Sequence, residues 1–175
     1  MKFTATKIPD IFILDMDRHE DERGFFARTF CEQEFEEQGL SFKPVQSNIS
    51  HNKQAFTLRG MHYHAPPFEE TKLVRCSAGR IFDVAVDIRP QSPTFKSWIG
   101  VELSPENGRG LYIPAGCAHG FLTLEDNSDV LYQMSPAFEP GHDRGFHWDD
   151  PGIAINWPAL PDVISDKDQI LATFF

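Results

Sequence analysis

The chain has 175 residues, of which 41% are hydrophobic, 13% aromatic and 24% charged. This length fits one domain over residues 1–175, and the composition is that of a folded protein, not a disordered or fibrous one. A formal net charge of -10 argues against binding to nucleic acid or to anionic membranes, because both reward basic surfaces. A small anionic ligand is not excluded, because a few converging cations are enough to hold one.

The cysteines Cys31, Cys76 and Cys117 show no CxxC spacing and cannot all pair with one another. The first residues, MKFTATKIPDIFILDMD, lack the uninterrupted apolar stretch of a signal peptide. No segment approaches the roughly 20 apolar residues that a membrane-spanning helix needs. We therefore expect a protein of the reducing cytoplasm.

Short runs rich in β-branched and aromatic residues follow one another along the chain and predict strands. They cover residues 12–16, 44–50, 57–64, 72–79, 80–89, 97–104, 110–114, 119–125 and 129–135. Turn-forming residues separate several of these runs, as at 105–108 and 126–128. Many short strands at this spacing predict an all-β sandwich or barrel.

The run RIFDVAVDIR (80–89) has the clearest alternation, because one face is apolar and the other carries charge. The apolar face consists of Phe82, Val84, Val86 and Ile88, and the other face of Ile81, Asp83, Ala85, Asp87 and Arg89. Helix is scarce. A short helix is predicted over 31–39, ending at Gly39, and a C-terminal one over 165–174, capped by Ser165.

Two blocks of glycine and histidine resemble the paired motifs of the cupin superfamily, whose fold is a small double-sheet β-barrel. The first block contains Gly60, His62-x-His64, Glu69, Glu70 and Gly79, and the second contains Gly108, Pro114-x-Gly116 and His119. On a strand, His62 and His64 project to one face, where His119 could join them inside a barrel. Three histidines and a carboxylate could hold a divalent first-row metal, or they could be partly buried side chains that hydrogen-bond to neighbours.

A longer series of segments resembles, in the same order along the chain, the dTDP-4-dehydrorhamnose 3,5-epimerase family. The segments are DERGFF (21–26), VQSNIS (45–50), TLRGMHY (57–63), KLVRCSAGRIFDVAVDIRPQSPTF (72–95), IPAGCAHGF (113–121), LYQ (131–133), WDDPGIAINWP (148–158) and SDKD (165–168). Members of this family are cupin-fold enzymes that act without metal on a nucleotide-linked 4-keto-6-deoxy sugar. The resemblance implies an all-β, cupin-type double-sheet β-barrel (jelly roll) with a few short helices and no cofactor.

The resemblance also implies which residues form the site. His62 would be the general base, Asp168 its partner, Tyr132 the general acid, and Lys72 the cation beside the developing enolate. The positions that would hold the sugar nucleotide are Arg23, Phe26, Gln46, Asn48, Arg59, His119, Phe138, Asp143 and Lys167.

The chemistry of such a reaction accounts for these residue types. A ketone at C4 acidifies the hydrogens at C3 and C5, so an imidazole can remove them if the enolate is stabilised. A buried carboxylate orients the imidazole, and a lysine at the enolate oxygen supplies electrostatic stabilisation. Inversion then needs a proton from the opposite face of the ring, because a base that returns its own proton restores the original configuration. A tyrosine that faces the histidine across the sugar can deliver it.

Four positions depart from the family pattern. Arg28 stands where RGFFxE has a glutamate that contacts the nucleotide, and His64 stands where a glutamine is usual. Phe138 replaces a tyrosine that stacks on the thymine ring, and Asp143 replaces a glutamate nearby. A phenylalanine can still stack on a base, whereas a reversed charge changes which groups a pocket accepts. We infer that the reaction class is retained more firmly than the nucleotide or the sugar.

The leading interpretation is a metal-independent epimerase that acts at C3, C5 or both carbons of a nucleotide-linked 4-keto-6-deoxyhexose, in the pathway to a deoxysugar such as rhamnose. One alternative is a metal-dependent cupin enzyme that uses His62, His64, Glu69 or Glu70, and His119. Another is a sugar-binding cupin without activity. The resemblance further implies a homodimer in which N-terminal strands contribute to the partner's sheet and site.

Overall fold

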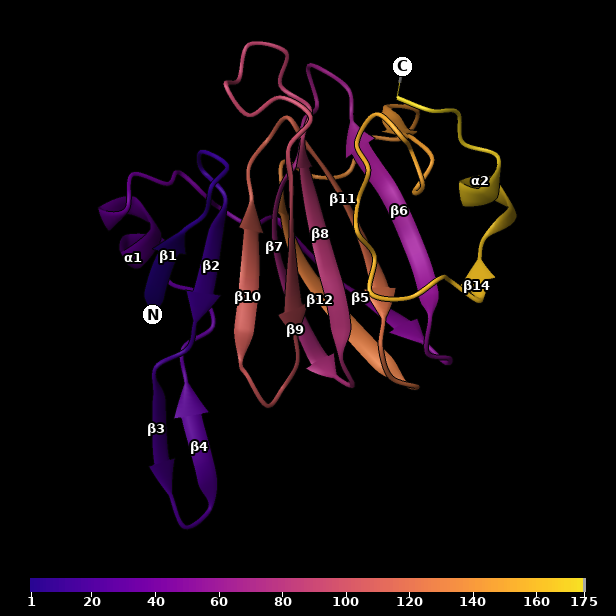
Figure 1. Cartoon of the computed structure of the whole chain (residues 1–175). Helices are drawn as coiled ribbons and strands as arrows, with labels where there is room; N and C mark the ends of the chain where they lie inside the picture. Colours follow the sequence, from indigo (N-terminus) through magenta and orange to yellow (C-terminus); the bar gives the residue numbers. More distant parts are fainter. Residues whose placement is uncertain (175) are drawn as a thin grey trace.

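The computed structural model describes residues 1–174 as two mostly antiparallel sheets packed face to face, with a hairpin that reaches away from them (Figure 1). The first sheet contains, in spatial order, β1 (Lys2–Ala5), β2 (Phe12–Asp15), β10 (Arg109–Ile113), β7 (Thr71–Ala78), β12 (Ser128–Ser135) and β5 (Gln46–Asn52). The second contains β13 (Asp143–Gly145), β6 (Thr57–His64), β11 (Cys117–Thr123), β8 (Ile81–Asp87) and β9 (Trp98–Leu103), with β14 (Val163–Ile164) parallel to β6. The predicted all-β, double-sheet architecture is confirmed.

Every predicted strand is present, and its ends differ from the prediction by at most two residues. The sequence did not reveal β1, β13, β14 or the hairpin of β3 (Arg18–Asp21) and β4 (Gly24–Ala27). These elements have at most four residues each, which is too short to show the alternating apolar face that identifies a strand. Pairing with neighbouring strands, not local preference, makes them extended.

The two predicted helices are present, but both are shorter than predicted, the second by more than half. Helix α1 (Glu32–Glu37) ends just before Gly39, which has a φ of +76°. Helix α2 (Asp166–Gln169) begins after the predicted cap, Ser165, whose Oγ accepts the backbone N–H of Asp168. Residues 170–174 are not helical, because this segment crosses the second sheet and places the Phe174 ring 5.0 Å from that of Phe146.

Three clusters of buried side chains hold these layers together. The first lies between the sheets and includes Val74 and Phe121. The second lies under α1 on the outer face of the first sheet, where the rings of Phe35 and Tyr112 are 5.6 Å apart. The third lies on the outer face of the second sheet, beneath residues 146–174. Apolar side chains fill only part of the space between the sheets, and polar side chains line the rest.

Strand β8 carries the predicted alternation, and the tertiary structure buries both of its faces. Val84 and Val86 belong to the outer cluster, whereas Asp83 and Asp87 lie on the inner side and have no exposed surface. Asp83 is hydrogen-bonded to the His119 ring inside the barrel, at 2.7 Å. Asp87 accepts hydrogen bonds from a group of nearby side chains, namely Arg89, Ser92 and Thr94. The two aspartates of the charged face are therefore buried and hydrogen-bonded, because a buried carboxylate without a partner is costly.

Strand β6 contains an irregularity that decides which of its side chains enter the barrel. His119 of β11 pairs with His62, whereas Phe121 pairs with Arg59, so β6 holds one residue more than β11 between these pairs. Strict alternation would place Arg59 and His62 on opposite faces of the sheet. The extra residue, a β-bulge, brings both side chains to the inner face.

The described chain contains no disulfide, since Cys31, Cys76 and Cys117 are all free. Burial raises the pKa of the Cys76 and Cys117 thiols to about 12, so these two side chains stay protonated near neutral pH. Within residues 1–174, neither helix has the length and apolar character needed to cross a membrane.

The bulge in β6 predicts a strong effect of a single methyl group. Gly60 has a φ of +124°, and a Cβ there would lie 2.6 Å from the Cα of Gly120. Gly60→Ala should lower the free energy of unfolding through two effects. Backbone strain should contribute about 1–3 kcal/mol, and overpacking against Gly120 about 1–3 kcal/mol more. Gly141→Ala is the matched control, because Gly141 also has a positive φ but open space around it. Equal losses in denaturant unfolding would contradict the steric argument.

Asp87 predicts a pH-dependent contribution to stability. Burial opposes its charge, but the hydrogen bonds from Arg89, Ser92 and Thr94 outweigh burial and lower the pKa from 3.8 to about 2. The folded-state pKa lies below the unfolded one, so the contribution is complete above about pH 4 and disappears as the pH falls toward about 2. Asp87→Asn should therefore cost roughly 2 kcal/mol near pH 7 and progressively less below pH 4.

Denaturant unfolding at a series of pH values measures the difference in the free energy of unfolding between Asp87→Asn and the parent protein. The exposed Asp162 provides the control, because Asp162→Asn should leave the pH profile unchanged. A cost of Asp87→Asn that stays constant down to pH 2 would contradict the assignment.

Candidate functional site

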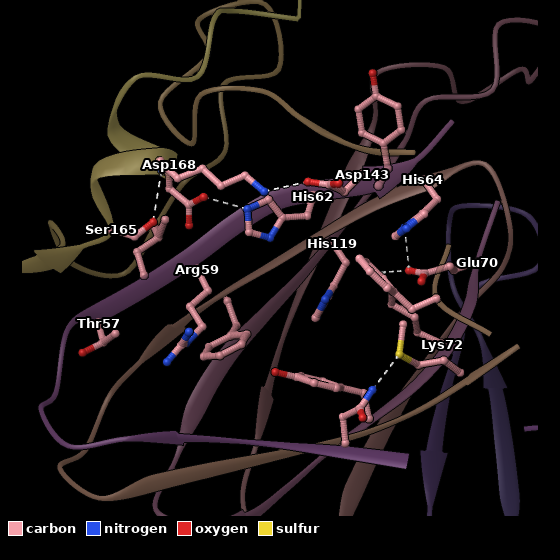
Figure 2. A pocket seen from close by; sticks show the side chains of 18 of the residues that line it. Thr57, Arg59, His62, His64, Glu70, Lys72, His119, Asp143, Ser165 and Asp168 are labelled. Atoms are coloured by element: carbon pink, nitrogen blue, oxygen red, sulfur yellow. Dashed lines mark hydrogen bonds and ion pairs between the residues drawn. The ribbon is translucent and has the colours of Figure 1, made fainter. Parts of the chain in front are cut away.

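A cavity of about 810 Å³ opens between the two sheets (Figure 2). Side chains from β5, β7 and β12 of the first sheet and from β6 and β11 of the second form its walls, and residues of β13, β14 and α2 complete the lining. The structure brings most of the predicted site residues together here: Gln46, Asn48, Arg59, His62, Lys72, His119, Tyr132, Phe138, Asp143, Lys167 and Asp168.

Two predicted site residues do not reach this cavity within one chain. Arg23 and Phe26 lie on the β3–β4 hairpin, which extends away from the barrel (Figure 1). The Arg23 side chain is 83% exposed and pairs with Asp21, and Phe26 is 75% exposed. Arg28, one of the departures from the family pattern, lies just after this hairpin and makes an ion pair with Glu34 at 2.9 Å.

His62 and Asp168 form the most constrained polar contact of the cavity. The Nε2 atom of His62 lies 2.7 Å from Oδ1 of the buried Asp168 (Figure 2). The backbone N–H of Gly60 donates to the other carboxylate oxygen at 3.3 Å, and Ser165 caps the helix that carries Asp168. The other ring nitrogen, Nδ1, has no partner within residues 1–174, so it can accept a proton from a bound molecule.

The surroundings of Asp168 keep its carboxylate charged. Burial alone would raise its pKa, but the hydrogen bond and charge of His62 and the donors at Gly60 and Ser165 lower the pKa below the ordinary value. A carboxylate in this position orients the imidazole and stabilises its protonated form.

Two further groups face the cavity from opposite sheets. His119 of β11 is held by Asp83, whose Oδ1 lies 2.7 Å from His119 Nε2. Tyr132 of β12 lies on the inner face of the first sheet, next to the buried cluster between the sheets. His62 belongs to the second sheet, so His62 and Tyr132 line the same cavity from its two sides.

Arg59 is positioned by a residue that the sequence interpretation missed. Its Nε donates to Oδ1 of Asn52 at 2.8 Å, and the amide of the buried Asn52 donates to the carbonyls of Ser50 and Ser128. Asn52 lies on the same face of β5 as Gln46 and Asn48, because alternate residues of a strand share a face. This spacing is the signal that could have identified it.

His64, Glu70 and Lys72 form a second buried polar contact in the cavity wall (Figure 2). The Oε2 atom of Glu70 lies 3.1 Å from Nδ1 of His64 and 3.1 Å from Nζ of Lys72. Each cavity histidine thus has a carboxylate of its own. Within residues 1–174, no group of three or more His, Cys, Asp or Glu side chains is arranged to hold a metal ion. The ligand set of the metal-dependent alternative, His62, His64, Glu69 or Glu70, and His119, is therefore not assembled.

The remaining predicted binding residues also have partners within the chain. Lys167 of α2 donates to Asp143 of β13 at 2.7 Å, and this hydrogen bond lowers the pKa of Asp143. The backbone N–H of Phe138 donates to Oε1 of Gln46 at 2.6 Å. The Phe138 ring meets the His64 ring edge-on, at 5.0 Å between centroids.

Known proteins resemble this chain over almost its whole length. The family model for dTDP-4-dehydrorhamnose 3,5-epimerase matches residues 5–175. The dTDP-4-dehydrorhamnose 3,5-epimerase of Salmonella typhimurium is 46% identical over 166 residues, which are 93% of this chain and 90% of the relative. The enzyme of the same name from Shigella flexneri is 45% identical over 96% of this chain and 93% of the relative.

Solved structures agree with this assignment. The Bacillus anthracis epimerase with TDP and pyrophosphate bound has a TM-score of 0.95 and 40% identity, covering 98% of each chain. The Legionella pneumophila enzyme in complex with dTDP-4-keto-L-rhamnose has a TM-score of 0.92 and 40% identity, covering 98% of this chain and 92% of that one. The chain therefore belongs to the dTDP-4-dehydrorhamnose 3,5-epimerase family, a group of isomerases with the cupin-type barrel.

Proposed function

We propose that this protein inverts C3 and C5 of a dTDP-linked 4-keto-6-deoxyhexose, with His62 as the general base and Tyr132 as the general acid. The observation that carries the proposal is the placement of these two side chains on opposite sheets around one cavity. The relatives at 40–46% identity, all named as 3,5-epimerases, support the choice of substrate class and of both carbons.

The imidazole of His62 suits the first step. Its Nε2 is hydrogen-bonded to Asp168, so Nδ1 is the atom that removes the proton from the carbon next to the ketone. The charge of Asp168 favours the imidazolium that results. Lys72 lies in the same cavity, where its ammonium can stabilise the developing enolate oxygen.

The phenol of Tyr132 suits the second step. A proton delivered from the first sheet arrives on the ring face opposite to the one that His62 deprotonates. The enolate is planar at the reacting carbon, so protonation from this side inverts the configuration. The cations Arg59 and Lys167, together with the amides of Gln46 and Asn48 and the His119 ring, supply donors for the sugar and its diphosphate.

We further propose that the protein is a homodimer in which the β3–β4 hairpin completes the partner's cavity. The hairpin carries two predicted binding residues, Arg23 and Phe26, that cannot serve the cavity of their own chain in this structure. Phe25 and Phe26 are 51% and 75% exposed, and apolar rings on an isolated hairpin favour burial against another surface.

Deuterium incorporation separates the proposed roles of base and acid. In deuterated water with dTDP-4-dehydro-6-deoxyglucose, the parent protein should incorporate deuterium at C3 and C5 with inversion. His62→Ala should lower the rates of deuterium exchange and of inversion about 10²–10⁴-fold. Tyr132→Phe should retain the exchange and lose the inversion. The control is His51→Ala on the exposed face of β5, which should behave as the parent. NMR of the sugar measures both rates, and inversion by Tyr132→Phe at the parent rate would contradict the role of Tyr132.

Complementation tests the shared site. Variants His62→Ala and Arg23→Ala should each be nearly inactive as homodimers. A hybrid dimer keeps one intact site, formed by the His62 cavity of one chain and the Arg23 hairpin of the other. Random pairing after co-expression should therefore restore about a quarter of the parent activity, because half of the dimers are hybrids with one working site of two. Absence of restoration, or a monomer in light scattering, would contradict the shared site.

A further inference from the structure

His64, Glu70 and Lys72 form a group that the proposed chemistry only partly uses. His64 comes from the end of β6 and Lys72 from the start of β7, so the group bridges the two sheets. The side chains of His64 and Glu70 are 5% and 2% exposed, and that of Lys72 is 14% exposed. All three belong to the cavity wall, with Glu70 between the other two (Figure 2).

The hydrogen-bonding rules assign the protons of this group. A carboxylate only accepts, so both Nδ1 of His64 and Nζ of Lys72 must donate to Oε2 of Glu70. The proton of a neutral His64 ring is therefore on Nδ1, and Nε2 carries none. The Nε2 atom is buried and has no partner within residues 1–174.

The charges of the group balance when the His64 ring is neutral. Lys72 and Glu70 then form one ion pair, and the imidazole adds a neutral donor to it. A protonated ring would bury an additional positive charge with an N–H at Nε2 that lacks an acceptor, which is costly. Another charged group near His64 is Asp143, its backbone register partner on the adjacent strand β13, and Lys167 donates a hydrogen bond to the Asp143 carboxylate.

We propose that His64 and Glu70 are positioning residues that hold the ammonium of Lys72 at the place where the enolate oxygen forms. This inference rests on the proposed function for its kinetic consequences. Lys72 has a flexible four-carbon stem, and an ammonium that can take many positions stabilises a developing charge poorly. Glu70 anchors it through one N–H, which leaves two N–H donors for a bound molecule. His64 in turn fixes the Glu70 carboxylate from the opposite sheet.

Substitutions at 64 test whether the ring acts through the lysine. His64→Leu removes the donor at similar size, and it should lower kcat roughly tenfold to a hundredfold with little change in KM. His64→Gln retains an N–H donor and should restore most of the loss. In a Lys72→Met background, His64→Leu should have less than about a twofold effect, because residues that act as a unit are not additive.

The exposed His51 of β5, paired with Asp129 of the neighbouring strand β12, provides a matched control, and His51→Leu should leave kcat and KM unchanged. An equal loss for His64→Leu and His64→Gln, or an undiminished loss in the Lys72→Met background, would overturn the proposal. Thermal unfolding of each variant identifies a loss that comes from misfolding.

A spectroscopic measurement on the unaltered protein decides the pairing independently of turnover. Nitrogen-15 NMR of the histidine rings should find a neutral His64 ring protonated at Nδ1. Glu70→Gln should weaken that preference, because an amide can also donate to the ring. An Nε2-protonated ring, or an imidazolium near neutral pH, would overturn the proposal even if turnover follows expectation. A protein that lacks deuterium exchange but has the Nδ1 tautomer would contradict the proposed function and support the pairing.

Discussion

The hydrogen bond between His62 and Asp168 joins parts of the chain that are 106 residues apart, and the arrangement of the cavity depends on it. For Asp168 to arrive there, the chain after β12 must cross the outer face of the second sheet and return beside β6 as β14 and α2. Phe146 and Phe174 hold that segment by burial against the sheet. Apolar packing outside the barrel thus determines a polar contact inside it.

The same barrel must supply both a core and a polar cavity, and pairing of charges makes this possible. Each histidine in the cavity wall meets a different carboxylate, so no buried imidazole faces the apolar interior alone. The pairs are His62 with Asp168, His119 with Asp83, and His64 with Glu70. Buried polar groups with partners rigidify a site, whereas unpaired ones destabilise it. The cavity therefore presents side chains whose orientation is set before a ligand arrives.

Three departures from the family pattern, His64, Phe138 and Asp143, line the cavity, whereas Arg28 lies outside it, just after the β3–β4 hairpin. Arg28 is bound by Glu34, and Asp143 by Lys167. His64 is bound by Glu70, and its ring also meets the Phe138 ring. Each altered side chain thus has a neighbour in this chain that accommodates it. These contacts fix the altered side chains, and His62 and Tyr132 line the cavity from opposite sheets.

The sequence by itself determined the longer strands and an all-β sandwich or barrel, because runs of β-branched and aromatic residues between turns are local signals. The resemblance to a known family, carried by several segments in the same order, also pointed to eleven of the residues that line the cavity. The resemblance had named Arg59 as a binding residue, but only the tertiary structure showed that a bulge beside Gly60 turns it inward and that Asn52 holds it. The same is true of residues 170–174, which are not helical because packing of Phe174 outweighs local helix preference. Such features depend on contacts that form only when the strands assemble, and no local pattern encodes the contacts themselves.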